Sequence, residues 1–93
     1  MTWIDDKRAE VGEKRMFDTL HRIGMNHPTY VRENAHGDRG FALWLMMVDR
    51  RLKPLSHRDL ADWHWRDAFD DGVDPAEAAK DATTADYFDG FPA

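Results

Sequence analysis

Five histidines are the first residues to examine for chemistry, because imidazole is the commonest protein ligand for metal ions. His57 and His64 stand seven residues apart, which on one helix separates them by about 10.5 Å along the axis. Two ligands so far apart cannot share an ion held at about 2.0 Å. His64 and Asp67 form the one remaining close pair, and the other three histidines show no metal-ligand spacing. We therefore expect no metal site and no cofactor.

Catalysis by a nucleophile or by paired carboxylates is also hard to assemble from these residues. The chain has no cysteine, and its one serine, Ser56, has no G-x-S-x-G context. The neighbouring carboxylates Asp5/Asp6 and Asp70/Asp71 diverge by about 100° on a helix, so they need not converge on a substrate. Glycine-rich phosphate-binding motifs are missing as well. We expect that this protein is not an enzyme.

Charge is distributed unevenly along the sequence. Residues 1–53 carry ten Lys and Arg against eight acids, a balance of +2, whereas residues 54–93 carry three against ten, a balance of −7. Phosphate contacts need a concentrated basic surface, and here the basic residues are interspersed with Asp and Glu. We expect no direct binding of nucleic acid and look to the acidic C-terminal part for a protein partner.

The length of 93 residues predicts one small domain, residues 1–93. The N-terminus lacks the apolar stretch of a signal peptide. The longest apolar run, residues 41–48, is far shorter than the roughly 20 residues that span a bilayer. A chain without cysteine is typical of a reducing compartment. We expect a soluble cytoplasmic protein that has no membrane contact.

Apolar periodicity in the first half predicts an amphipathic helix over residues 5–24, ended by Gly24 and Asn26. A polar connector should follow, with a short extended or one-turn piece at residues 30–33. The apolar run 41–48 is rich in Leu, Met and Ala, and Pro54 lies beyond it. These features favour a central helix over residues 39–53.

The second half carries clear start and stop signals. Ser56 and Asp59 have the spacing of a capping box, and Gly72 is placed as a left-handed stop, so a helix over residues 56–71 is predicted. Asp74 and Pro75 predict the start of a short fourth helix. Residues 86–93 should form a tail that docks through its aromatic side chains. The fold class is therefore all-α, a small helical bundle of three long helices, a short fourth and a docked tail.

On the third predicted helix, Trp63 and Trp65 are two residues apart and should point about 200° away from each other. Either both rings pack against neighbouring helices, or one indole lies at the surface, where it could hold a partner. The charges at residues 58, 62, 66 and 70 should form an alternating strip on the wet side of this helix. The predicted core comprises Phe17, Leu20, Ile23, Leu43, Trp44, Met47, Leu60 and Trp65.

The segment from residue 55 to residue 79 has a recognisable order of residues. Asp59-Leu60 and Asp62-Trp63 precede Phe69-Asp70-Asp71-Gly72, and Pro75-Ala76-Glu77-Ala78-Ala79 follows. This pattern resembles short uncharacterised proteins of phages and mobile elements, including those of actinobacterial hosts. It covers about a quarter of the chain. The resemblance implies a phage-like origin and a helical hairpin, and it carries over no functional residue.

Together these observations predict a phage-encoded cytoplasmic factor that binds and inhibits a host protein, in host takeover or defence evasion. Two alternatives stay open. One is an acidic DNA mimic that inhibits a nucleic-acid-binding host enzyme. The other is a self-associating structural protein, such as a homodimer, that uses the apolar face of residues 41–48. The predicted partner-binding residues are Trp63, Asp67, Asp70, Asp71, Tyr87 and Phe88.

Overall fold

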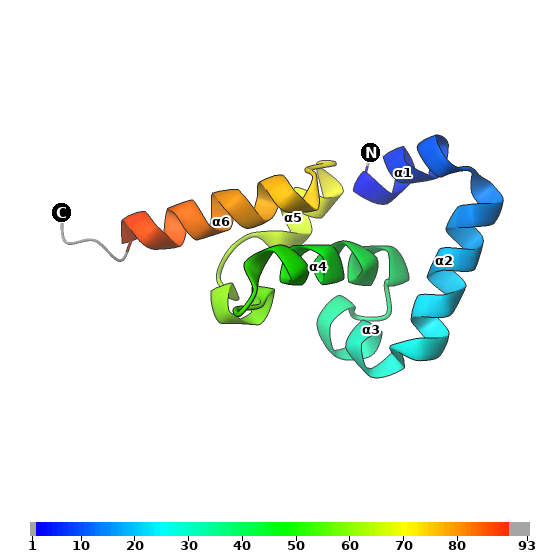
Figure 1. The fold of residues 1–93 in the computed structure, drawn as a ribbon, viewed down its shortest axis with the longest axis horizontal. Helices are drawn as coiled ribbons and strands as arrows, with labels where there is room; N and C mark the ends of the chain where they lie inside the picture. The colour runs from blue at the N-terminus through cyan, green and yellow to red at the C-terminus, as the bar shows by residue number, and fades with distance from the viewer. Residues whose placement is uncertain (1, 90–93) are drawn as a thin grey trace.

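The computed structural model describes residues 2–89, with side chains up to Thr84. The described residues form helices and turns without a strand, which confirms the all-α prediction (Figure 1). None of the helices among them has the length and apolarity that crossing a membrane requires. In chain order the elements are α1 (Trp3–Val11), α2 (Glu13–Asn26), α3 (Pro28–Ala35), α4 (Arg39–Leu52), the 3-10 helix η1 (His57–Leu60), α5 (Trp65–Asp70) and α6 (Pro75–Asp89).

Helix α4 is the centre of the packing and contacts every other element. It begins at Arg39, where the Asp38 carboxylate caps it by accepting the Phe41 N–H at 3.1 Å. The sequence predicted this helix over residues 39–53, and the structure confirms it. Trp44 and Val48 are fully buried in its middle.

Burial of α4 removes the surface on which the self-association alternative depended. Within residues 41–48, the side chains of Phe41, Trp44, Leu45 and Val48 are all buried. Their neighbours are the helices that pack around α4. Only Met47 on this run counts as exposed. The expectation of an open apolar face here is therefore wrong, because the run is apolar on nearly all sides and is enclosed accordingly.

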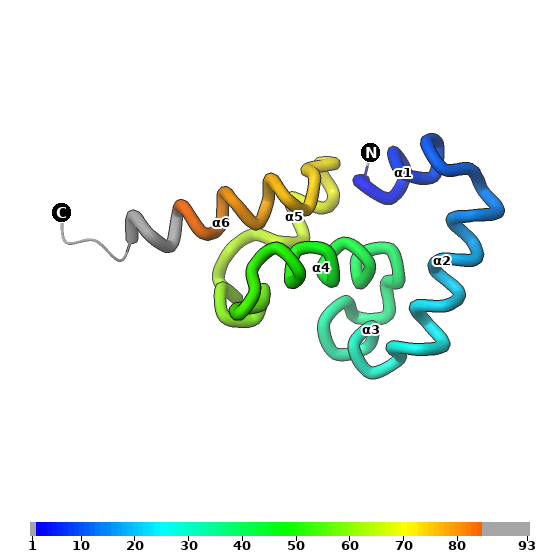
Figure 2. The backbone as a smooth tube through the Cα atoms, viewed as in Figure 1, coloured from blue at the N-terminus to red at the C-terminus, as the bar shows by residue number. Residues whose placement is uncertain are grey.

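The single helix predicted over residues 5–24 is two helices. The chain turns at Gly12, whose φ of +94° is strained for any residue with a side chain beyond hydrogen. Helix α1 begins with a capping box between Thr2 and Asp5, and α2 ends at Asn26, near the predicted end. The path of the chain shows α2 at one end of the molecule, away from α6 (Figure 2).

The predicted polar connector contains a full helix, α3, in place of a one-turn piece. Pro28 occupies its first turn, a position where the missing N–H costs nothing, and Val31 and Ala35 are buried. His36, with a φ of +50°, and Gly37 end it. The polar composition concealed the helix, because the positions that pack inward are few: Val31, Ala35 and the partly buried Tyr30.

Three predicted core residues, Ile23, Trp44 and Trp65, are buried, and Leu43 and Leu60 pack partly buried against the core. Leu20 is half-buried. Two predictions are wrong: Phe17 is 66% exposed and Met47 is 37% exposed. Phe17 is exposed because the inner side of α2 is formed by Met16 and Ile23.

Helix α6 begins at Pro75 as predicted, and the Asp74 carboxylate accepts the Ala76 N–H at 3.0 Å. Its inward positions are alanines, Ala78, Ala79 and Ala82, which let α6 approach α4 closely. The helix continues to Asp89 and does not give way to a tail at residue 86. The hydroxyls of Thr83 and Thr84 bond back to carbonyls one turn earlier, at 2.8 and 2.9 Å, so these poor helix residues are accommodated. The side chains of Tyr87, Phe88 and Phe91 lie outside the described part, so tail docking stays a prediction.

Candidate protein-binding surface

The helix predicted over residues 56–71 is broken into η1 and α5. Ser56 and Asp59 form the predicted capping box, but the helix that it starts is a single 3-10 turn. The Leu60 carbonyl would bond the N–H four residues later in a continuous α-helix. Here it accepts the Trp63 N–H at 3.1 Å and the Trp65 indole N–H at 3.0 Å. This tertiary use of one carbonyl diverts the chain at residues 61–64.

The break brings the two tryptophans together. Their ring centroids are 4.5 Å apart, so the expected divergence of about 200° is wrong. Trp65 is buried and meets Trp44 edge-on, at 6.2 Å between ring centroids. Trp63 is half-buried against the core, and its ring also stacks on the exposed His64 ring at 4.1 Å. Of the two indoles, Trp63 is therefore the one with access to solvent.

The three predicted partner-binding acids of α5, Asp67, Asp70 and Asp71, are all exposed. Asp70 is neutralised by Arg66, whose Nε lies 3.1 Å from its Oδ1. The same guanidinium reaches Asp38 at 3.1 Å and lies over the Phe41 ring, 5.0 Å from its centroid. Only this part of the predicted alternating strip forms, since residues 58 and 62 precede α5.

Asp67 and Asp71 form a like-charged pair on another side of α5. They are four residues apart, and the Asp71 N–H bonds the Asp67 carbonyl at 2.9 Å, so both follow the helical path. Neither carboxylate has a cation within ion-pair distance among the described residues. Such a pair destabilises a helix by about 0.2 to 0.5 kcal/mol. The pair therefore does not help to hold the helix together.

His64 caps the start of α5, and its carbonyl accepts the Ala68 N–H at 3.1 Å. Asp67 and Asp71 have the i, i+4 spacing of one helix face, and His64 is the N-cap residue before that helix. We name the surface formed by Trp63, His64, Asp67 and Asp71 the α5 strip.

Gly72, with the predicted positive φ of 81°, ends α5, and its N–H and that of Val73 bond back to Phe69 and Ala68 in a Schellman pattern.

A polar network that the sequence did not indicate lies between α3, α4 and η1. One Asp49 oxygen accepts the His57 N–H at 2.8 Å and lies 2.7 Å from His57 Nδ1, while the other accepts the Tyr30 hydroxyl at 2.6 Å. His57 is buried, and its ring meets Tyr30 and Trp65 edge-on. Only the eight-residue spacing of Asp49 and His57 across the Pro54 turn could have suggested it.

This network shifts two pKa values. Burial raises the pKa of Tyr30 far above its usual value, and the hydrogen bond and charge of Asp49 add to the shift against an opposing effect of Arg58. Burial also favours a raised pKa for Asp49, but the hydrogen bonds from His57 and Tyr30 outweigh it and hold that pKa below its usual value. The groups satisfy one another and fix η1 on α4. Ser56 directly precedes His57, but its hydroxyl and its backbone N–H bond the Asp59 carboxylate instead.

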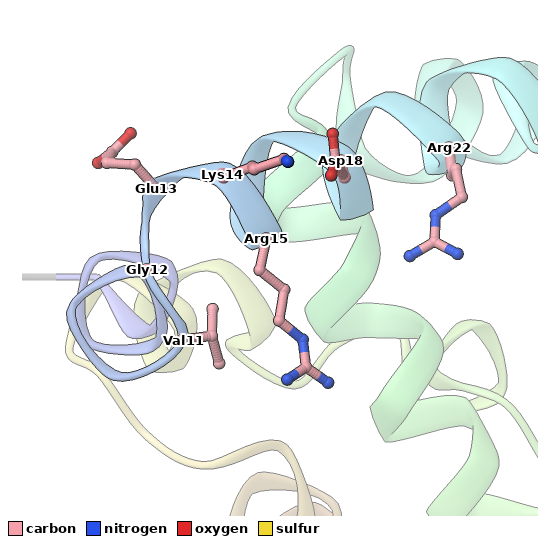
Figure 3. A pocket seen from close by; sticks show the side chains of 7 residues that line it. All are labelled: Val11, Gly12, Glu13, Lys14, Arg15, Asp18 and Arg22. Atoms are coloured by element: carbon pink, nitrogen blue, oxygen red, sulfur yellow. The ribbon is translucent and has the colours of Figure 1, made fainter.

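A second charged surface was also missed, because its cations come from three different helices. Shallow hollows follow one another across α2, α4 and α6, and an arginine lines each junction: Arg22, Arg50 and Arg51. The first hollow, of about 470 Å³, lies at the α1–α2 turn, where Arg15 and Arg22 extend to the same side of α2 (Figure 3). Lys80 lines the last hollow. We name the surface lined by Arg22, Arg50, Arg51 and Lys80 the arginine hollows.

Metal chemistry gains no support from the arrangement of the described residues, where His, Asp and Glu side chains do not gather in groups of three. Of the other predicted site residues, Tyr87 and Phe88 have side chains beyond those that the structure describes. The structure thus leaves Trp63 partly accessible and Asp67 and Asp71 exposed within residues 63–71, and places Asp70 in an ion pair with Arg66.

Comparison with known proteins finds phage relatives of about half the chain's length. The chain is 36% identical over 50 residues to the Gene 87 protein of Mycobacterium phage L5, a match that covers half of this chain and 94% of that protein. It is 40% identical over 45 residues to the Gene 87 protein of Mycobacterium phage D29, covering 45% of this chain and 83% of that protein. No protein-family model and no solved structure matches. The chain belongs to the family of the mycobacteriophage Gene 87 proteins.

Proposed function

We propose that this chain is a non-enzymatic phage protein that acts in the cytoplasm by binding a host protein and blocking it sterically. The phage origin of its relatives supports the first part of this proposal. The observation that supports binding through the C-terminal half is the exposed pair Asp67 and Asp71, which has no cation within ion-pair distance among the described residues and follows the half-buried Trp63 in the sequence. A host surface that carries Lys or Arg around an apolar pocket would fit this combination.

The contrast between Asp70 and its neighbours supports the same surface. Arg66 neutralises Asp70 and ties α5 to Asp38, so this ion pair has a structural role. Asp67 and Asp71 repel each other and contribute nothing comparable to the fold. Their charge is available to a partner, and opposite charge on that partner would speed association and fix its orientation.

Capture of host proteins from a mycobacterial lysate tests the proposal. The bait is the whole chain, compared with Asp67→Lys/Asp71→Lys. A matched control is Glu10→Lys/Glu33→Lys, which makes the same change in charge at exposed positions in the last turns of α1 and α3. We expect the control to retain a host protein that the α5 variant loses. Equal recovery by both variants would reject the α5 strip.

A second control separates the two charged surfaces. The variant Arg50→Glu/Arg51→Glu changes the arginine hollows and leaves the α5 strip intact. If that variant alone loses the host protein, the contact lies in the hollows and the proposal is wrong.

The DNA-mimic alternative makes a different prediction for the same captured protein. A mimic would be displaced by duplex DNA, and its binding would weaken steeply with salt. We expect duplex DNA to leave the complex intact, since Arg66 interrupts the acids of α5 and Trp63 offers an apolar contact.

A further inference from the structure

Helix α2 presents an apolar strip to solvent on the side opposite the core. Phe17 is 66% exposed and Met25 is 68% exposed, although Met16 and Ile23 of the same helix are buried. His21 lies between the two exposed residues, and its ring stacks on Phe17 at 6.0 Å with an interplanar angle of 8°. Residues four apart lie in line on a helix. The strip Phe17, His21 and Met25 is thus a continuous surface, which we name the α2 strip.

Contiguous exposed apolar surface marks interaction sites, whereas singly exposed apolar residues need no partner. Helix α2 lies at the outer end of the molecule, so its free face is open to another chain (Figure 2). The order of side chains along the strip is nearly symmetric about His21, with an apolar residue four positions before it and another four positions after it. An antiparallel second copy would therefore meet each Phe17 with a Met25, and methionine sulfur packs favourably on aromatic rings.

We infer that two copies of this chain associate through their α2 strips, antiparallel about a two-fold axis at His21. A two-fold interface must be self-complementary, and the charges beside the strip satisfy this condition. Asp18 and Arg22 lie on the same flank, and in the antiparallel arrangement each Asp18 lies about 3 Å along the axis from the other copy's Arg22. Neither residue forms an ion pair within the described chain. Lys14 then approaches the carboxyl end of the facing helix, where its charge is favourable.

The contact is small. Helix α2 has 14 residues, which makes it about 21 Å long. One face of that length buries less than the roughly 800 Å² per partner of a standard interface. The dissociation constant of the dimer should therefore lie in the micromolar range or above. The α5 strip lies on other helices, so this inference stands independently of the proposed host contact.

Sedimentation of the whole chain at about 10 µM to 1 mM tests the inference. We expect the mass to rise from 10.8 kDa toward twice that value. Phe17→Glu and Met25→Glu should each raise the dissociation constant by about tenfold or more, with an unchanged helical circular dichroism spectrum. Leu55→Glu, at another exposed apolar residue, should leave dimerisation unchanged. A chain that stays monomeric throughout, or a dimer that tolerates Phe17→Glu, overturns the inference.

A charge swap tests the antiparallel register. Asp18→Arg and Arg22→Asp should each weaken the dimer, because each places like charges opposite one another. The double variant should recover most of the lost affinity, since the pairs are restored in reverse. Non-specific apolar association would give no such recovery. A double variant that recovers no affinity would overturn the two-fold arrangement.

Discussion

His57 Nδ1 lies 2.7 Å from Asp49 Oδ1, and the same oxygen accepts the His57 backbone N–H at 2.8 Å. The other Asp49 oxygen accepts the Tyr30 hydroxyl. One carboxylate on the central helix thus holds both α3 and η1, and η1 leads directly into the segment that carries the α5 strip. The free energy of unfolding and its dependence on pH should both depend on this carboxylate.

Replacing Asp49 by Asn leaves one acceptor where three donors converge. We expect Asp49→Asn to reduce the free energy of unfolding by about 1 to 3 kcal/mol, the usual cost of unsatisfied buried partners. Urea unfolding followed by circular dichroism measures this. Asp62→Asn, in the exposed turn after η1, is the control. An unchanged midpoint for Asp49→Asn would show that the network contributes nothing to stability.

The lowered pKa of Asp49 predicts how stability depends on acid. A carboxyl whose pKa is lower in the folded state stabilises the fold fully above its unfolded value, about 3.9, and loses that contribution as the pH falls through the folded value. The difference in unfolding free energy between wild type and Asp49→Asn should therefore shrink below about pH 4. Urea titrations between neutral and acidic pH measure it, and a constant difference would contradict the assignment.

Tyr30 should resist ionisation in alkali. Burial, and then its bond to Asp49, raise the pKa of its phenol, so the fold loses stability as the pH rises above about 10, the unfolded value. A Tyr87→Phe variant leaves Tyr30 as the one tyrosine, and tyrosinate absorbance then reports it alone. We expect that signal to appear together with the loss of helical circular dichroism. A native-like spectrum with ionised Tyr30 near pH 10 would be the opposite result.

Gly12 should be needed for the turn between α1 and α2. A Cβ at this position would meet nothing within 4 Å, so the cost of Gly12→Ala comes from the backbone alone, at its φ of +94°. We expect a loss of about 1 to 3 kcal/mol in urea unfolding, the cost of a strained backbone. An increase in stability would mean that residues 3–26 prefer the continuous helix that their sequence pattern predicts.

What the sequence could predict was local. Three predicted signals act over a few residues, and the structure confirms each of them: the capping box of Ser56 and Asp59, the Gly72 stop and the Pro75 start. The break at residues 61–64 was not, because it depends on the Trp65 indole taking the Leu60 carbonyl. Helix α3 was missed for a similar reason, since its stability comes from packing on α4 and not from a strong apolar pattern.

The charged surfaces divide in the same way. Asp67, Asp70 and Asp71 are neighbours in the sequence, so their exposure could be predicted, although the helix predicted to carry them was the longer one over residues 56–71. That Arg66 neutralises only Asp70 could not, because Asp38 and Phe41, which help to set the position of the guanidinium, come from the start of α4. The arginine hollows could not be predicted from the sequence, because they form only when α2, α4 and α6 come together.

Hydrogen exchange of the chain in complex with the captured host protein tests the central claim most directly. The account predicts slowed exchange of backbone amides in residues 63–72 on binding, with α1 and α2 exchanging as in the free chain. Protection that appears around Arg22, Arg50 and Lys80, with residues 63–72 unchanged, would contradict it and place the contact on the arginine hollows.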